Sequence, residues 1–220
     1  MKKTLLLGLL AVGLVGISTA QQKTKKELGV TDEEALQVLM SSFEKDPRFL
    51  SKAKQDESQR ICSKYPSREA MPAKELKRVI DLENKNMKYP QWGIYWGDWK
   101  EGEKVAKISR GGRYSLYHRD NPTLKGGNCY ACHLIEKGVP GGTMGPQLTA
   151  YGKRYGITKE NLNSPESLEK LKTVYKVIYN AWHAYPCSSM PRFGYHGVLS
   201  PEDVMNIATY LLHPESPVNK

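Results

Sequence analysis

The chain has 220 residues and a formal net charge of +10, from 33 lysines and arginines against 23 aspartates and glutamates. Acidic and basic residues alternate through most of the sequence, without the long basic block that typically binds nucleic acid or a membrane surface. The charge therefore indicates a solvated surface that steers a negatively charged partner or substrate, and it argues against a nucleic-acid-binding protein.

The N-terminus has the pattern of an export signal. Lys2 and Lys3 are followed by an apolar run over residues 5–17 and then by the small residues Ser-Thr-Ala at 18–20. This order is typical of a secretory signal peptide. The apolar run is shorter than the roughly 20 residues that span a bilayer, which disfavours the alternative of a retained anchor. We expect residues 1–20 to be cleaved and the mature chain to lie in the periplasm without a membrane span.

Export affects the expected oxidation state of the four cysteines. In an oxidising compartment a free thiol is unusual unless it is used. Cys129 and Cys132 belong to one motif, described below, which leaves Cys62 and Cys187. We therefore expect a disulfide between these two. A reactive or metal-binding Cys187 is the alternative.

The sequence divides into two regions of different composition. Residues 21–90 are charged, poor in glycine and helix-like. A capping box over residues 31–34 predicts a first helix, a second helical stretch follows Pro47 and runs toward Cys62, and a third helix begins near Pro72. This region carries no recognisable chemistry, and we interpret it as a helical N-terminal extension.

Residues 91–220 are richer in glycine, proline and aromatic residues, and form the second predicted domain. Three N-caps predict its main helices, at Asp98, at Ser164 before Pro165, and at Ser200 before Pro201. A long glycine-rich loop covers residues 110–128. Gly102 and Tyr210 suggest that the first and last of these helices cross closely. No strand pattern or repeat is present, so the predicted fold is mostly α.

The most informative motif is Cys129-Tyr130-Ala131-Cys132-His133, the Cys-x-x-Cys-His pattern of c-type haem attachment. Two thiols three residues apart on one turn can each bond a vinyl group of one porphyrin, and the adjacent imidazole can reach the iron. A thioredoxin-like redox pair needs a βαβ setting, which is absent. A zinc site needs a second ligand pair, and none is visible. We predict one covalently bound haem c, with His133 as the proximal iron ligand.

The distal ligand is predicted to be Met190. Class I cytochromes c supply a methionine from a downstream loop, often followed by proline, and Met190-Pro191 lies between two predicted helices. His183 and His196 flank it and are the rivals. Met144 is too near His133, and the remaining methionines lie in helical patterns where they usually fill the core, at Met40, Met71, Met87 and Met205. His/Met ligation raises the reduction potential relative to bis-histidine.

Gly145-Pro146 predicts the partner of the proximal histidine. A ligating histidine donates its other ring N–H to a carbonyl, and in class I cytochromes a Gly-Pro turn after the motif provides it, so we assign that carbonyl to Pro146. An ordinary surface turn is the alternative. Four residues lie in segments that could approach the haem propionates, although each is individually more typical of a solvated surface: Arg110, Arg113, Arg192 and Tyr195.

These motifs resemble one family, SoxX, the monohaem cytochrome subunit of the SoxAX thiosulfate-oxidising complex. The matching stretches are residues 97–100, 102–103, 126–133, 142–146, 187–194 and 211–219. The most specific of them are Met-Pro-Arg-Phe-Gly at 190–194 and Ser-Pro-Val-Asn at 216–219. Gln147 and His213 depart from the common serine and aspartate. The resemblance implies a class I cytochrome c fold for residues 91–220.

The resemblance also implies a partner and a role. Family members bind a SoxA cytochrome subunit, whose haem hosts the conjugation of thiosulfate to a cysteine of the carrier SoxYZ, the reaction of L-cysteine S-thiosulfotransferase. This chain would then pass the electrons to a soluble acceptor and would contain no catalytic residue. A free-standing electron shuttle is the alternative function, and an enzyme or sensor with an open iron site is a third.

Overall fold

A computed structural model describes residues 29–42, 54–108 and 126–220 of the chain. These described residues fall into two units, one within residues 1–54 and the other within residues 55–220. The described part contains helices and no strand, which confirms the mostly α prediction. The predicted signal peptide, Pro47, and Arg110 and Arg113 lie outside the described residues.

In the first unit the described helix is α2, Asp32–Ser42. Its N-terminus is capped as the sequence predicts, because the Glu34 amide donates to Thr31 Oγ1 at 3.1 Å and the Thr31 amide donates to Glu34 Oε2 at 2.7 Å. This reciprocal pair satisfies two backbone donors that a helix start otherwise leaves unpaired.

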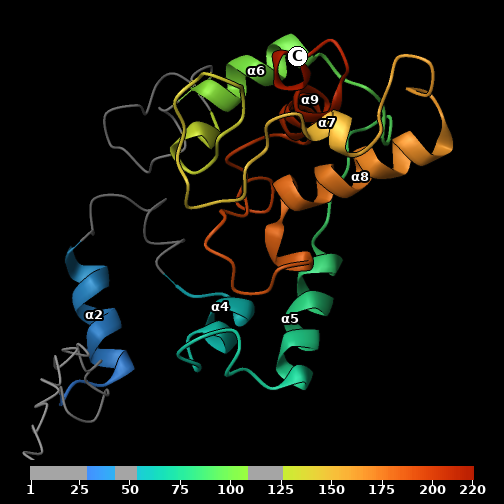
Figure 1. The fold of residues 1–220 in the computed structure, drawn as a ribbon. Coiled ribbons are helices and arrows are strands. Elements are labelled where there is room, and N and C mark those ends of the chain that lie inside the picture. The colour runs from blue at the N-terminus through green and yellow to red at the C-terminus, as the bar shows by residue number, and fades with distance from the viewer. Residues whose placement is uncertain (1–28, 43–53, 109–125) are drawn as a thin grey trace, which may run out of the picture. The chain divides into compact units, whose positions relative to one another are not determined.

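In chain order, the described helices of the second unit (Figure 1) are α4 Glu57–Cys62, α5 Ala73–Lys85, α6 Trp99–Lys107, α7 Tyr151–Arg154, α8 Pro165–Tyr179 and α9 Pro201–Leu212. Short 3₁₀ turns are η3 Cys129–Ala131, η4 Ala181–His183 and η5 Pro217–Asn219. The predicted caps are present: Asp98, Ser164 and Ser200 each accept hydrogen bonds from the first turn of α6, α8 and α9.

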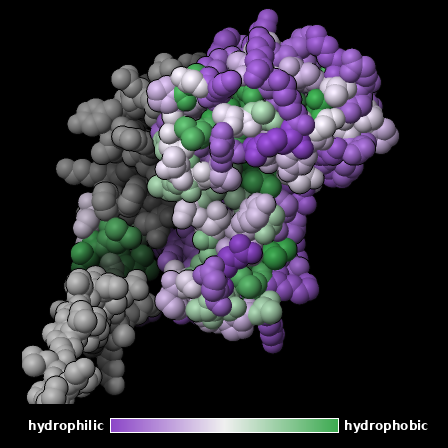
Figure 2. Space-filling model, in the orientation of Figure 1, coloured by the Kyte–Doolittle hydropathy of each residue, from purple (hydrophilic) through white to green (hydrophobic). Residues whose placement is uncertain are grey.

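The main core lies where α9 meets α6 and α8. From α9 it takes fully buried side chains such as Ile207, Tyr210 and Leu212, and from α8 it takes Leu171 and Tyr175. The face of this unit seen in Figure 2 is largely hydrophilic, and its apolar residues form small separate areas. The helices therefore turn their apolar stripes toward one another, as amphipathic helices of a globular protein do.

The crossing of α6 and α9 is close because Gly102 has no side chain. A Cβ at Gly102 would collide with the backbone of Asn206 and come within 2.9 Å of the Ile207 amide nitrogen. The Asn206 side chain also accepts from the Asp98 amide at 2.9 Å. The close crossing predicted from Gly102 is thus present. Helix α6 of this crossing also contacts the Cys-x-x-Cys-His turn.

A smaller apolar cluster joins α4 and α5 to the second half of the chain. Its buried members are Ile61, Met71 and Val79, and the side chain of Trp182 in η4 packs against them. Helices α4 and α5, which composition assigns to the N-terminal extension, therefore belong to the same compact unit as α6 to α9. In Figure 1 these two helices lie side by side at one end of that unit, away from α6.

Candidate functional site

The Cys-x-x-Cys-His motif forms one tight turn, η3. The His133 amide donates to the Cys129 carbonyl at 3.0 Å, and the Cys132 amide donates to the same oxygen at 3.2 Å. Asn128, before the turn, has a left-handed backbone with φ of 47°, which asparagine tolerates better than most residues. Both thiols and the imidazole are thereby placed on a single turn.

The two thiols of the motif are free of any disulfide. Cys129 packs against the main core, and burial raises the pKa of its thiol to about 12. A thiol held in this protonated form is a poor nucleophile and a poor metal ligand at neutral pH. In the part of the chain that the structure describes, no group of three or more His, Cys, Asp or Glu side chains is arranged to hold a metal ion by itself.

The imidazole of His133 is held by the segment that contains Gly145 and Pro146. Its Nδ1–H donates to the Pro146 carbonyl at 2.8 Å. A Cβ on Gly145 would stand 2.6 Å from His133 Nδ1 and 2.8 Å from Nε2, so only glycine allows the chain to pass this close to the ring. The hydrogen bond fixes the ring orientation and leaves Nε2 as the nitrogen able to bind a metal.

The loop after the motif is bonded to it along the backbone. The Gly142 amide donates to the Tyr130 carbonyl and the Gly145 amide to the Cys132 carbonyl, both at 2.8 Å. A Cβ at Gly142 would collide with the backbone of Ala131. Because the loop is bonded in this way, the Pro146 carbonyl is a fixed feature of the site rather than part of a loose surface turn.

A polar cluster beneath the motif was missed by sequence reasoning. Glu136 Oε1 accepts from the hydroxyls of Tyr130 and Tyr210, each at 2.5 Å, and lies 3.0 Å from Lys107 Nζ. Burial opposes ionisation of Glu136, but the two hydroxyls and the ammonium outweigh it and lower the pKa of the carboxyl. The cluster ties the motif residue Tyr130 to α6 and α9, whose cluster members are far from it in sequence.

The segment around Met190 is ordered by two hydrogen bonds. Trp182 Nε1 donates to the Ser188 carbonyl at 2.7 Å, and Ser188 Oγ accepts from the Met190 amide at 3.1 Å. Met190 is partly buried and packs against the main core, as Cys129 does. Met71 and Met205 are buried, as predicted for core methionines, whereas Met144 is 78% exposed.

The two rival histidines differ. His196 stacks edge-on against Tyr195, with ring centroids 4.9 Å apart. Nε2 of His183 is buried and has no hydrogen-bond partner among the described residues. Burial, helped by the charge of Lys176, lowers the pKa of His183 to about 4, so its imidazole is neutral at physiological pH.

This lowered pKa predicts a pH dependence of stability. Between pH 4 and the ordinary histidine value of 6.5, the unfolded chain binds a proton at His183 that the folded chain does not. The free energy of unfolding should therefore be highest above pH 6.5 and fall as the pH is lowered toward 4. Urea titrations at several pH values should show a shallower fall for His183→Gln.

The matched variant is His213→Gln, because burial also lowers the pKa of His213. His213→Gln should remove only the smaller contribution that His213 makes to the fall of the unfolding free energy with pH. The contribution of His183 should remain. If the free energy of unfolding of His183→Gln fell with pH as steeply as that of the wild type, His183 would be protonated in the folded state as readily as in the unfolded chain.

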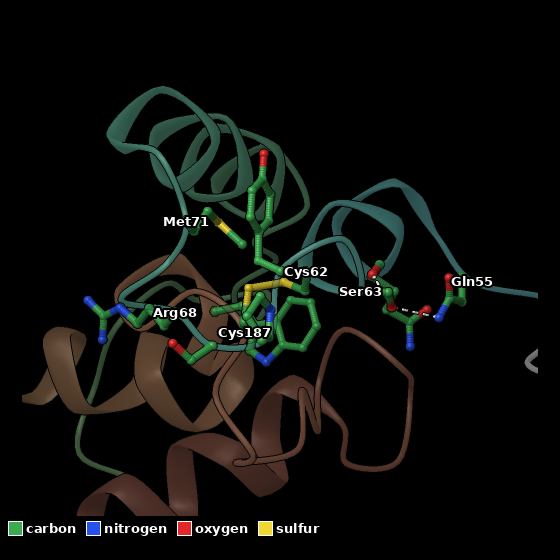
Figure 3. A pocket seen from close by; sticks show the side chains of 11 residues that line it. Gln55, Cys62, Ser63, Arg68, Met71 and Cys187 are labelled. Carbon is green, nitrogen blue, oxygen red and sulfur yellow. Dashed lines mark hydrogen bonds between the residues drawn. A yellow bond between two sulfur atoms is a disulfide. The ribbon is translucent and has the colours of Figure 1, made fainter. Parts of the chain in front are cut away.

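The expected disulfide between Cys62 and Cys187 is present, with Cα atoms 5.6 Å apart. It lies beside an open hollow of about 380 Å³ (Figure 3). Met71 and Arg68 from the α4–α5 connection also line this hollow. The bridge rules out the alternative of a reactive or metal-binding Cys187 thiol in the disulfide-bonded protein.

Arg192 lies in a different setting from the one expected. Its side chain is 2% exposed, and its guanidinium donates to Glu83 Oε1 at 2.9 Å and to Asp56 Oδ2 at 2.6 Å. The ring centroid of Tyr195 lies 4.3 Å from the guanidinium carbon. The description as a solvated surface residue is thus wrong for Arg192, because α4 and α5 supply carboxylates that the local sequence does not reveal.

Comparison with known proteins places the chain in a family. No family model matches the sequence. A protein of Aquifex aeolicus (strain VF5), described as an uncharacterized lipoprotein, is 36% identical over 207 residues, which cover 94% of this chain and 86% of that protein. The chain belongs to the family of this lipoprotein. Within the described segments, no helix has both the length and the apolar character needed to cross a membrane.

Proposed function

We propose that the chain is an exported monohaem c-type cytochrome of the SoxX type, the electron-transfer subunit of a thiosulfate-oxidising complex. One observation carries the haem assignment: two free thiols and an imidazole share one turn, and the imidazole donates to a backbone carbonyl at 2.8 Å. A ligating histidine needs its ring orientation fixed, and the Pro146 carbonyl supplies this. A zinc site would also need further ligands, and no group of three or more His, Cys, Asp or Glu side chains is arranged for a metal among the described residues.

The residues that would hold the haem are Cys129 and Cys132 through thioethers and His133 and Met190 at the iron. When bound, the haem supplies a one-electron Fe(III)/Fe(II) couple. The Pro146 carbonyl would hold the His133 ring so that Nε2 stays available to the iron, and Cys129 and Met190 both pack against the main core. The crossing of α6 and α9 supports a class I cytochrome c fold.

Attachment is tested by mass and spectrum. The wild-type chain, produced in the periplasm of a host with c-type cytochrome maturation, should gain the mass of one haem. The Cys129→Ser, Cys132→Ser double variant should gain none, because the thioethers need both thiols. The Cys62→Ser, Cys187→Ser double variant is the matched control and should retain the haem. A wild-type chain without haem overturns the proposal.

The distal ligand has its own readout. A methionine–iron bond gives ferric cytochromes a weak far-red absorbance band. We expect this band in the wild type and its loss in Met190→Ala. Without the band in the wild type, Met190 is not the ligand, and His183 becomes the candidate because its neutral Nε2 is buried without a described partner.

The complex and the compartment are tested by purification. Affinity capture from the native periplasm should yield a 1:1 complex with a second c-type cytochrome, as a SoxA-like subunit would be. A monomer under all conditions favours the free-standing shuttle. We propose cleavage after Ala20, and the mass of the mature protein distinguishes this from a retained N-terminal run or the lipid anchor that the relative's name describes.

A further inference from the structure

The short segment 187–192, which contains Met190, is attached to α4 and α5 on both sides. On one side, three residues before Met190, Cys187 is bonded to Cys62 at the end of α4. On the other side, two residues after it, Arg192 pairs with Glu83 of α5 and with Asp56, the N-cap of α4.

The Arg192 attachment is buried and geometrically specific. The side chains of Arg192 and Glu83 are 2% and 1% exposed, and Asn180 Nδ2 donates to the second oxygen of Glu83 at 2.6 Å. The guanidinium lies between two rings, 4.4 Å from the centroid of Trp182 and 4.3 Å from that of Tyr195. A buried ion pair adds little net stability, but losing one partner is costly because the other charge is left buried alone.

Trp182 links this cluster to the backbone of Met190. The same indole that lies against the Arg192 guanidinium donates to the Ser188 carbonyl, and the Ser188 hydroxyl accepts from the Met190 amide. A displacement of Arg192 therefore reaches Met190 by two short routes, through Pro191 along the chain and through Trp182 and Ser188.

We infer that Arg192 is a positioning residue for Met190, and that α4 and α5 act as the support that keeps this thioether in place. The inference rests on the proposed function, in which Met190 binds the haem iron. A distal ligand is effective only when its supporting groups hold it near its bonding geometry, and Arg192, Glu83 and Trp182 are those groups here.

The test compares Glu83→Gln with Arg78→Gln in the haem-loaded protein. Glu83→Gln removes the buried carboxylate from Arg192. Arg78→Gln breaks another ion pair between α4 and α5, to Glu57, which is exposed and has no link to segment 187–192. The readouts are the far-red band and the rate at which imidazole binds the ferric protein, because imidazole enters only when Met190 has left.

We expect Glu83→Gln to weaken the band and to speed imidazole binding by roughly tenfold or more, since the buried guanidinium of Arg192 would lose its charged partner. Arg78→Gln should match the wild type. Arg192→Lys keeps the positive charge but loses the forked geometry of the guanidinium, so it should also speed imidazole binding. This variant takes the place of Glu83→Gln if Glu83→Gln does not fold.

The possible results distinguish the positioning role of Arg192 from the assignment of the haem. A wild-type band together with unchanged imidazole binding in Glu83→Gln and Arg192→Lys overturns the positioning role and leaves the haem assignment intact. A haem-loaded wild type without the band overturns both the positioning role and Met190 as ligand. A chain that takes up no haem overturns the proposed function itself.

Discussion

Replacing both Cys62 and Cys187 with serine is expected to lower the free energy of unfolding by about 5 kcal/mol. The bridge joins residues 125 positions apart, and the entropy that a crosslink removes from the unfolded chain grows with the length of the closed loop. Cys187 has a left-handed backbone with φ of 61°, and serine retains that conformation, so the comparison isolates the bond.

The measurement is the urea midpoint followed by far-ultraviolet circular dichroism. Wild-type protein treated with a phosphine reductant should unfold at the midpoint of the double variant, because both then lack the Cys62–Cys187 bond. The proposed thioether bonds would resist such reduction. A double variant with the wild-type midpoint would show that the unfolded chain gains little freedom without the bridge. The single variant Cys62→Ser leaves a free thiol and is the less informative comparison.

Local sequence signals were enough to predict the starts of α2, α6, α8 and α9 and the disulfide, but not the start of α4 or the short helix α7. Asp98, Ser164 and Ser200 are caps whose partners lie within three residues, so a short window contains the whole interaction. The pairing of Cys62 with Cys187 followed from composition and compartment, because two of the four cysteines belonged to another motif. In both cases the prediction did not need the tertiary structure.

The buried polar clusters were not predictable in the same way. Arg192 and Glu83 are 109 residues apart, and Tyr130 and Tyr210 are 80 apart. Each residue alone resembles a surface residue or a core aromatic, and only the packing of α5 or α9 supplies its partner. The composition change near residue 90 is not a structural boundary, because α4 and α5 pack against Trp182.

Each of these two clusters fixes one segment of the candidate site. The Glu136 cluster holds the Cys-x-x-Cys-His turn to α6 and α9, and the Arg192 cluster holds the Met190 segment to α4 and α5. Each places a carboxylate where its hydrogen bonds are satisfied by the protein itself. A carboxylate bonded on several sides in this way favours a single arrangement of the groups around it, here the Cys-x-x-Cys-His turn and the Met190 segment.

Gly145→Ala is expected to abolish the His133 arrangement. The new methyl group would stand 2.6 Å from Nδ1 and 2.8 Å from Nε2 of the ring, well inside contact distance. The ring cannot retreat without losing the 2.8 Å hydrogen bond to Pro146, and the loop cannot retreat without losing the bond between the Gly145 amide and the Cys132 carbonyl.

Overpacking of this kind costs about 1–3 kcal/mol, and the lost hydrogen bond adds about 1 kcal/mol. We therefore expect the ratio of six-coordinate low-spin to other forms of the haem-loaded protein to fall by roughly tenfold or more. Optical spectra of the ferric protein, taken at equal haem content, measure this ratio.

The control is Gly138→Ala in the same loop. A Cβ there meets no atom within 4 Å, but its φ of 76° makes any side chain costly by about 1–2 kcal/mol. Gly138→Ala should thus lower the urea midpoint while leaving the ferric spectrum unchanged. If Gly145→Ala also kept the wild-type spectrum, the passage of Gly145 over the ring would have no part in orienting His133, and the Pro146 carbonyl alone would carry that role.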